Sequence, residues 1–229
     1  MLETILDQYG IYILILALGS ISQFMITSTF NRFSRVENTT GLTGGQIATD
    51  ILKRNDFSDV QLQDNGSNDL TDHFDPRNKI VSLSSNIYHG DSVAAAAVAA
   101  HECGHVMQYQ TKYAGIAVRN MILQPSIVAG QVWLIVVAIG FFLDFLGLIY
   151  VGIGLLGIAI LFQVLTLPIE FDASKRALTT IKENGYVTDE QLPGCRKMLN
   201  AAAFTYVAST LGSLLTLMYY LNMANRRRR

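Results

Sequence analysis

Four long apolar stretches alternate with polar segments along the chain. They cover residues 9–30, 127–143, 145–167 and 204–224, and each is near the ~20 residues that a helix needs to cross a bilayer. The first stretch has no charged residue, and it follows the acidic Glu3 and Asp7 instead of the basic start of a signal peptide. The pattern predicts a retained N-terminal span, a membrane hairpin and a C-terminal apolar helix.

Asp144 is the one charged residue between the two apolar stretches of the predicted hairpin. Its place at their midpoint predicts a tight reversal of the chain at the far membrane surface. The alternative is an intramembrane carboxylate that serves ion transport. Pro125 and Pro168 are predicted to mark the entry and the exit of the hairpin, since proline disfavours a continuing helix.

The longest polar segment covers residues 31–126 and combines a helix with short strands. Thr43 is suited to cap a helix that continues through Arg54 with an apolar stripe. Strand-like patterns separated by turn residues follow at 60–63, 70–74 and 79–84. We expect a small antiparallel sheet there. An edge strand of that sheet would pair with an extended substrate peptide, and a purely structural meander is the alternative.

The composition supports a membrane protein and argues against a nucleic-acid partner. Half of the residues are hydrophobic and 15% are charged, whereas soluble domains carry about 25% charged residues. The formal net charge of −1 lacks the basic excess that a nucleic-acid ligand requires. Two cysteines give no disulfide framework.

The chemistry of the chain centres on the sequence HECGH, which is residues 101–105. It follows an alanine-rich run, 92–100, that predicts a closely packed helix. On a helix His101 and His105 share a face, so both imidazoles can bind one metal ion, and Glu102 lies close enough to hold a water there. This is the residue set of zinc hydrolysis. Cys103 points away from His101 and is interpreted as a packed residue.

Two histidines leave zinc short of a protein ligand, and Glu170 is the candidate for the third. It follows the hairpin, and two crossings would return it to the membrane side of His101. We expect Glu170 at the start of a helix, with Asp172 facing elsewhere and orienting a histidine or an arginine. His73 and His89 are weaker alternatives for the third ligand, because a loop histidine is more often solvated.

Three motifs give the chain a specific resemblance. HECGH after Ala-Ala, LTDHFDPRNKIVSLSSNIYHG at 70–90 and PIEFDASKRAL at 168–178 resemble the YugP-type family of membrane zinc metallopeptidases. More distantly, the chain is similar to the HtpX and CAAX-prenyl-protease gluzincins, which follow HExxH with an E-x-x-A-D pattern. Glu170 and Ala173 match that pattern, whereas Ser174 stands in place of the aspartate. The resemblance implies a zinc-dependent endopeptidase in a bacterial membrane.

The sequence thus predicts a mainly α, integral membrane protein with a zincin-like core, a small antiparallel sheet and about four transmembrane helices. Its expected parts are the N-terminal span 1–30, the HECGH part 31–126, the hairpin 127–167, a helical part 168–203 and the C-terminal helix with a basic tail 204–229. Zn²⁺ is the expected cofactor, held by His101, His105 and Glu170, with Glu102 as the base. The expected partners are a peptide or membrane-protein substrate and the lipid bilayer.

Lysine and arginine are concentrated in the polar segments, which places the catalytic side in the cytoplasm under the positive-inside tendency. The basic tail then lies on the outer side if 204–224 spans, against that tendency. Two rival functions remain open at this point. A zinc-stabilised scaffold would bind the metal in a closed shell without activity, and a transporter would use Asp144 in its pathway.

Overall fold

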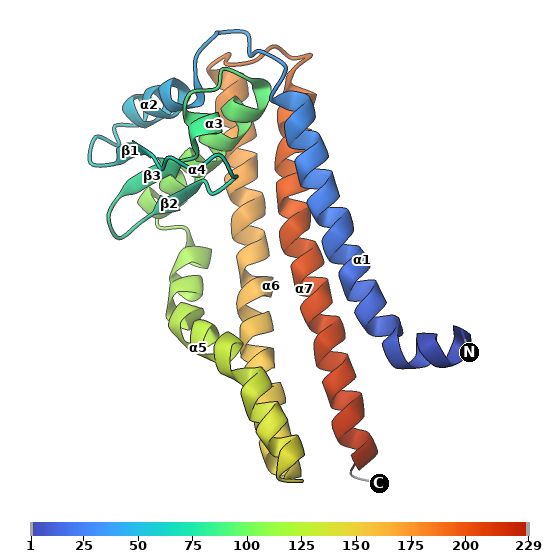
Figure 1. The fold of residues 1–229 in the computed structure, drawn as a ribbon. Coiled ribbons are helices and arrows are strands. Elements are labelled where there is room, and N and C mark those ends of the chain that lie inside the picture. The colour runs from blue at the N-terminus through green and yellow to red at the C-terminus, as the bar shows by residue number, and fades with distance from the viewer. Residues whose placement is uncertain (1, 228–229) are drawn as a thin grey trace. The chain divides into compact units, whose positions relative to one another are not determined.

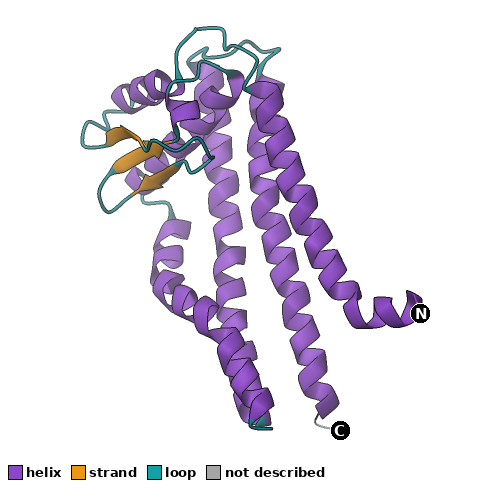
Figure 2. Ribbon diagram, in the orientation of Figure 1, coloured by secondary structure: helices purple, strands orange, loops and turns teal. Residues whose placement is uncertain are grey.

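The computed structural model describes residues 2–227, which are mainly helical with one small sheet (Figures 1 and 2). The chain folds into two compact units. The helical unit consists of the residues up to Gln23, Ala114–Pro168 and the residues from Phe204 onward. The sheet unit consists of Phe24–Tyr113 and Ile169–Ala203, and it contains the strands and the HECGH sequence.

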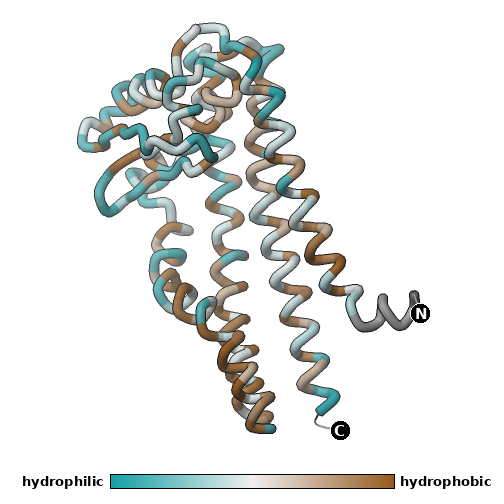
Figure 3. The backbone as a smooth tube through the Cα atoms, in the orientation of Figure 1, coloured by the Kyte–Doolittle hydropathy of each residue, from teal (hydrophilic) through white to brown (hydrophobic). Residues whose placement is uncertain are grey.

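Four helices among the described residues are long and apolar enough to cross a membrane. They are α1 (Leu2–Phe33), α5 (Ala114–Phe142), α6 (Leu146–Glu183) and α7 (Leu192–Arg227). Apolar residues are concentrated along α1, α5 and α6 (Figure 3). The predicted membrane architecture is therefore confirmed. An unbroken helix suits these segments because it satisfies the backbone polar groups that lipid cannot.

Within the helical unit, α5, α6 and α7 share an apolar cluster. Val137, Ile149 and Ala224 are its fully buried members, one from each helix. Gly152 of α6 lies so near α5 that a Cβ at this position would come within 2.9 Å of the Trp133 carbonyl oxygen. Small residues at such points let membrane helices pack closely.

The hairpin turn between α5 and α6 falls at Asp144, as predicted. Asp144 has a φ of 53°, a left-handed conformation that Asp tolerates better than most residues. Its carboxylate accepts a hydrogen bond from Arg227 Nη1 at 2.9 Å, and the Arg227 guanidinium lies 4.8 Å from the centre of the Phe141 ring. Asp144 is thus an exposed turn residue paired with the end of α7.

The two prolines do not end the helices, so the prediction that a new helix starts at Glu170 is wrong. Pro125 lies inside α5 and Pro168 lies inside α6. Glu170 consequently lies in the interior of α6, not at the start of a new helix. A proline removes one backbone hydrogen bond, but a break in an apolar segment would expose several backbone groups to lipid, which costs more.

The small sheet is mixed, whereas the sequence suggested an antiparallel one. Its strands are β1 (Gln61–Asp64), β2 (His73–Asp75) and β3 (Ile80–Leu83), in the order β1-β3-β2. β3 pairs parallel with β1 and antiparallel with β2. Val81 and Leu83 are fully buried, while both outer strands are partly exposed. The most apolar strand therefore takes the centre, and this separates β1 from β2.

The core of the sheet unit forms around α2 (Gly44–Arg54) and α4 (Val93–Gln110), with the short α3 (Ser85–Tyr88) beside them. Thr43 caps α2 in a capping box with Gln46, as predicted. Ile47 and Ile51 of α2 are fully buried, and each such side chain contributes about 1.5–3 kcal/mol. The alanine run of α4 is also buried, so neighbouring elements approach its backbone closely.

Candidate metal centre

α4 places the two histidines of HECGH side by side. Ser92 caps the helix by accepting a hydrogen bond from the Ala95 backbone N–H at 3.1 Å. His101 and His105 are four positions apart, so they lie about one helical turn apart, with their ring centroids 4.8 Å apart. Both side chains are largely buried, at 14% and 19% exposure. The predicted face of the helix is thus formed.

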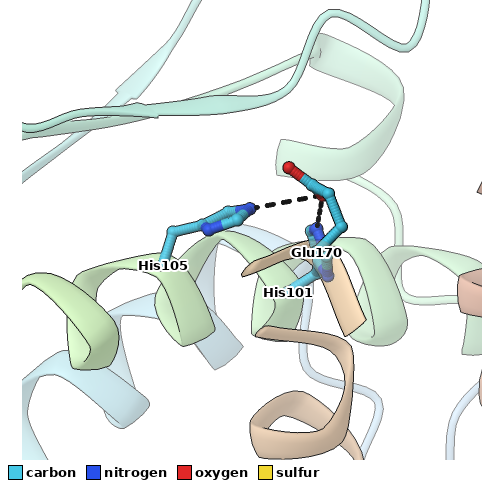
Figure 4. Close-up of side chains that lie close together, drawn as sticks. All are labelled: His101, His105 and Glu170. Carbon is cyan, nitrogen blue, oxygen red and sulfur yellow. Dashed lines mark hydrogen bonds and ion pairs between the residues drawn. The ribbon is translucent and has the colours of Figure 1, made fainter. Parts of the chain in front are cut away.

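Glu170 reaches the same point from α6. Its Oε2 lies 3.2 Å from His101 Nε2 and 3.6 Å from His105 Nε2 (Figure 4). One ligand atom from each of the three residues lies within 4.8 Å of the other two. Two imidazole nitrogens and one carboxylate oxygen are a donor set that zinc binds in hydrolases. The structure therefore brings together the three residues that the sequence predicted as metal ligands.

A glycine brings the two helices close enough for this contact. A Cβ on Gly104 would lie 2.6 Å from the Ala173 carbonyl oxygen of α6. Real Cβ atoms are almost never that close, so any side chain here would push α6 away. Gly104 within HECGH thus sets the distance between the histidines and Glu170.

Negative charge surrounds the two imidazoles. Glu102 is buried, at 6% exposure. Burial disfavours a charged His105, but the carboxylates of Glu170 and Glu102 outweigh it and raise the pKa of His105 to about 9. Burial also raises the pKa of Asp72 to about 6, hydrogen bonds from Ser84 oppose this rise, and the charge of Glu102 adds to it. Such a site favours a cation, and this agrees with its donor set.

Side chains outside the cluster contact the other nitrogen of each histidine. Ser174 Oγ lies 3.2 Å from His101 Nδ1, and Gln108 Oε1 lies 3.0 Å from His105 Nδ1. Ser174, which stands where the E-x-x-A-D pattern has aspartate, thus contacts one of the two histidines of HECGH. Gln108 is not among the site residues predicted from the sequence. Its spacing of three residues from His105 on the same helix was the available signal.

Asp172 does not touch the histidines directly. Its Oδ2 accepts hydrogen bonds from Arg176 Nε at 2.6 Å and from Gln108 Nε2 at 2.9 Å. Asp172 thus orients an arginine, which is one of the two expected alternatives. It is connected to His105 only through Gln108.

The remaining candidates lie elsewhere in the sheet unit. His73 Nδ1 lies 2.9 Å from the Thr71 carbonyl oxygen, and His89 Nε2 lies 2.9 Å from Asp64 Oδ2. Neither belongs to the metal-binding group found among the described residues.

Cys103 is fully buried, and burial raises the pKa of its thiol, which suits a packed residue.

Comparison with known proteins agrees with this geometry. Residues 8–225 match the model of a family described as "Putative neutral zinc metallopeptidase". The chain belongs to this family. It is 39% identical over 212 residues to a Bacillus subtilis (strain 168) protein named "Putative membrane protease YugP", and the alignment covers 92% of this chain and 94% of that one. No solved structure matches the chain.

Membership of the family confirms the resemblance that the three motifs carried. It also confirms zinc as the expected cofactor, and His101, His105 and Glu170 lie together as a possible site for it. The relative is a membrane protease by name, and four helices here are suited to a membrane, so membrane and metalloprotease character agree. Neither comparison assigns roles to individual residues.

Proposed function

We propose that this chain is a membrane-embedded zinc endopeptidase in which His101, His105 and Glu170 hold the metal. The convergence of their three ligand atoms beside a buried glutamate carries the proposal. Bound zinc would supply Lewis acidity that polarises the scissile carbonyl and eases the loss of a proton from water. The protein's own contribution is to position the ligands, hold the substrate and move the proton.

Glu102 is the residue proposed to move that proton. It neighbours His101 on α4, and its effect on the pKa of Asp72 indicates that the two carboxyl groups lie near each other. Glu102 would accept a proton from the attacking water and deliver it to the amine nitrogen that leaves.

β2 offers a place for an extended substrate. It forms one edge of the sheet, and the Phe74 ring lies 5.9 Å from that of Tyr109 on α4. Asp72, directly before β2, interacts with Glu102. A peptide added to the outer edge of β2 would therefore run along the helix that carries the catalytic residues.

We propose membrane proteins or peptides near the membrane as the substrates. Glu170 follows the end of the apolar stretch 145–167 by only three residues, along one continuous helix. At a rise of about 1.5 Å per residue, this ligand lies about 5 Å along the helix from the last residue of the apolar stretch. A cleavage site at this depth suits a bond close to the lipid surface.

The decisive experiment replaces Glu102 with glutamine in the purified protein. Glu102→Gln should retain zinc but cleave a fluorogenic peptide library about 10²–10⁴-fold more slowly, because it cannot accept the proton. Glu190→Gln, at an exposed position of the sheet unit, is the matched control. Cleavage by Glu102→Gln at the parent rate would refute the assigned base. A zinc-loaded parent without any cleavage would favour the scaffold alternative.

A further inference from the structure

The orientation of the Gln108 side chain is fixed by two acceptors on α6. Gln108 is fully buried, and its Nε2 lies 2.7 Å from the Ile169 carbonyl oxygen and 2.9 Å from Asp172 Oδ2. Neither a carbonyl oxygen nor a carboxylate can donate a hydrogen bond, so the NH₂ group of Gln108 must face both of them. The amide oxygen then has one possible direction, toward His105.

This direction determines which nitrogen of His105 carries the proton. Gln108 Oε1 lies 3.0 Å from His105 Nδ1, and an amide oxygen only accepts hydrogen bonds. Nδ1 must therefore carry the hydrogen, and in the neutral ring that binds a metal this leaves the lone pair on Nε2. That atom faces Glu170 Oε2 at 3.6 Å, where the proposed metal site lies.

Arg176 is the last residue in this series of hydrogen bonds. Its Nε donates to Asp172 Oδ2 at 2.6 Å, and both side chains are partly buried. Asp172 thus keeps its charge and its place, and it can anchor the NH₂ group of Gln108. The series Arg176, Asp172, Gln108 and His105 lies wholly within the sheet unit.

His101 lacks an equivalent constraint. Its Nδ1 lies 3.2 Å from Ser174 Oγ, and a hydroxyl group can donate or accept a hydrogen bond. Ser174 therefore stabilises either tautomer of His101, whereas an aspartate at this position would accept only. The two ligand histidines are thus held unequally.

We propose that Gln108 is a positioning residue that holds His105 with its proton on Nδ1, and that Asp172 and Arg176 keep the Gln108 amide oriented. This inference rests on the proposed zinc site. Partners of this kind orient the ligand ring, and their loss typically weakens metal binding 10–100-fold. Ser174 does not fix the tautomer of His101, so zinc binding should depend more strongly on Gln108 than on Ser174.

Two substitutions at position 108 separate this role from simple packing. Gln108→Met keeps the size but removes the acceptor for His105. Gln108→Glu keeps an acceptor but buries a charge beside Asp172. If Gln108 only fills space, Met should be tolerated better than Glu in both folding and zinc binding. If it orients His105, zinc should bind more weakly to Gln108→Met than to Gln108→Glu, although Met costs less stability.

Zinc affinity would be measured by chelator competition on full-length protein in detergent micelles. Gln108→Met should weaken it about 10–100-fold, and Gln110→Met, at an exposed position of α4, should leave it unchanged. In ¹⁵N-histidine NMR spectra of the zinc-loaded parent, His105 should show an Nδ1 proton protected from exchange with water, and Gln108→Met should lose that protection. The chain has only four histidines, so the signals can be assigned by substitution.

Ser174→Asp provides a second test that does not disturb position 108. It should add the same protection to His101 and tighten zinc binding, while Ser174→Ala should not. Unchanged zinc affinity and proton exchange in Gln108→Met would overturn the inference. If His105→Ala still bound zinc like the parent, the ligand set itself would be wrong. The two failures are therefore distinguishable.

Discussion

Gly104 of α4 and Ala173 of α6 lie in backbone contact inside the metal centre. A Cβ at Gly104 would meet the Ala173 carbonyl oxygen at 2.6 Å, and the backbone there cannot easily yield. The contact falls between the two histidines on one helix and three residues beyond Glu170 on the other. The geometry of the ligands thus depends on a position that carries no side chain.

Gly104→Ala should therefore separate the two helices. We expect it to lower the free energy of unfolding by about 1–3 kcal/mol and to weaken zinc binding. Gly154→Ala is a matched control on α6, since no atom lies within 4 Å of its added Cβ. Alanine there should be neutral or stabilising by up to about 1 kcal/mol. Thermal unfolding and zinc titration of both variants would check this, and equal behaviour would contradict it.

Removal of the metal should destabilise the sheet unit. A ligand that binds only the folded state adds about 4 kcal/mol at a concentration 1,000 times its dissociation constant. A zinc chelator should therefore lower the unfolding temperature of the parent protein. His105→Ala should abolish this response, while His89→Ala, whose side chain is 68% exposed and pairs with Asp64, should keep it. A chelator response that survives in His105→Ala would place the metal elsewhere.

The features that the sequence predicts well are those that depend on neighbours in the chain. The helical spacing of His101 and His105, the Thr43 cap and the apolar spans all follow from local periodicity. The turn at Asp144 was also predictable, but its partner Arg227 was not, because 83 residues separate the two. Contacts across such distances leave no local pattern.

Some features of the metal centre were likewise predictable from the sequence, and others were not. The closeness of Glu170 to the two histidines was predictable because zinc chemistry demands a third donor. Its place inside α6 was not predictable, because proline usually ends a helix. The role of Gln108 depends on Ile169 and Asp172, which lie on another helix. The central position of β3 likewise depends on which of the three strands is buried best in the core. A single sequence does not show which strand that is.

The buried Asp72 carboxyl group should make stability depend on pH. Its pKa in the folded protein is about 6, raised from 3.8 chiefly by burial and further by Glu102, against hydrogen bonds from Ser84. Well below pH 4 Asp72 is protonated in both the folded and unfolded states. As pH rises from 4 through 6, only the unfolded state ionises readily, so stability falls by up to about 3 kcal/mol.

Asp72→Asn should remove this dependence and gain stability relative to the parent at neutral pH. Asp75→Asn is the contrasting control, because hydrogen bonds from Asn78 and Arg77 lower the pKa of Asp75. It should lose stability at neutral pH, and the loss should vanish as pH falls through the usual range of an aspartate. Unfolding temperatures between pH 4 and 7, with chelator present throughout, would test both signs. If the unfolding temperatures of Asp72→Asn and the parent changed with pH in the same way, the prediction for Asp72 would be contradicted.

The distribution of charge predicts that the catalytic side faces the cytoplasm. Residues 31–126 carry eight Lys and Arg and residues 168–203 carry five, whereas none lies next to Asp144 in the sequence. The arginines at the end of α7 oppose this bias. Arg227, however, pairs with Asp144 and lies over the Phe141 ring. Part of the opposing charge is thereby neutralised, so the larger positive segments should decide the orientation.

Cysteine labelling in intact cells would measure the orientation directly. Cys103 and Cys195 are fully buried, so a membrane-impermeant maleimide should leave the parent protein unlabelled. Asp144→Cys, at the exposed hairpin turn, should react in intact cells. Glu190→Cys, in the exposed loop before α7, should react only after the cells are permeabilised. The reverse pattern would place the metal centre outside the cytoplasm, and the substrates would then have to be sought among exported or surface proteins.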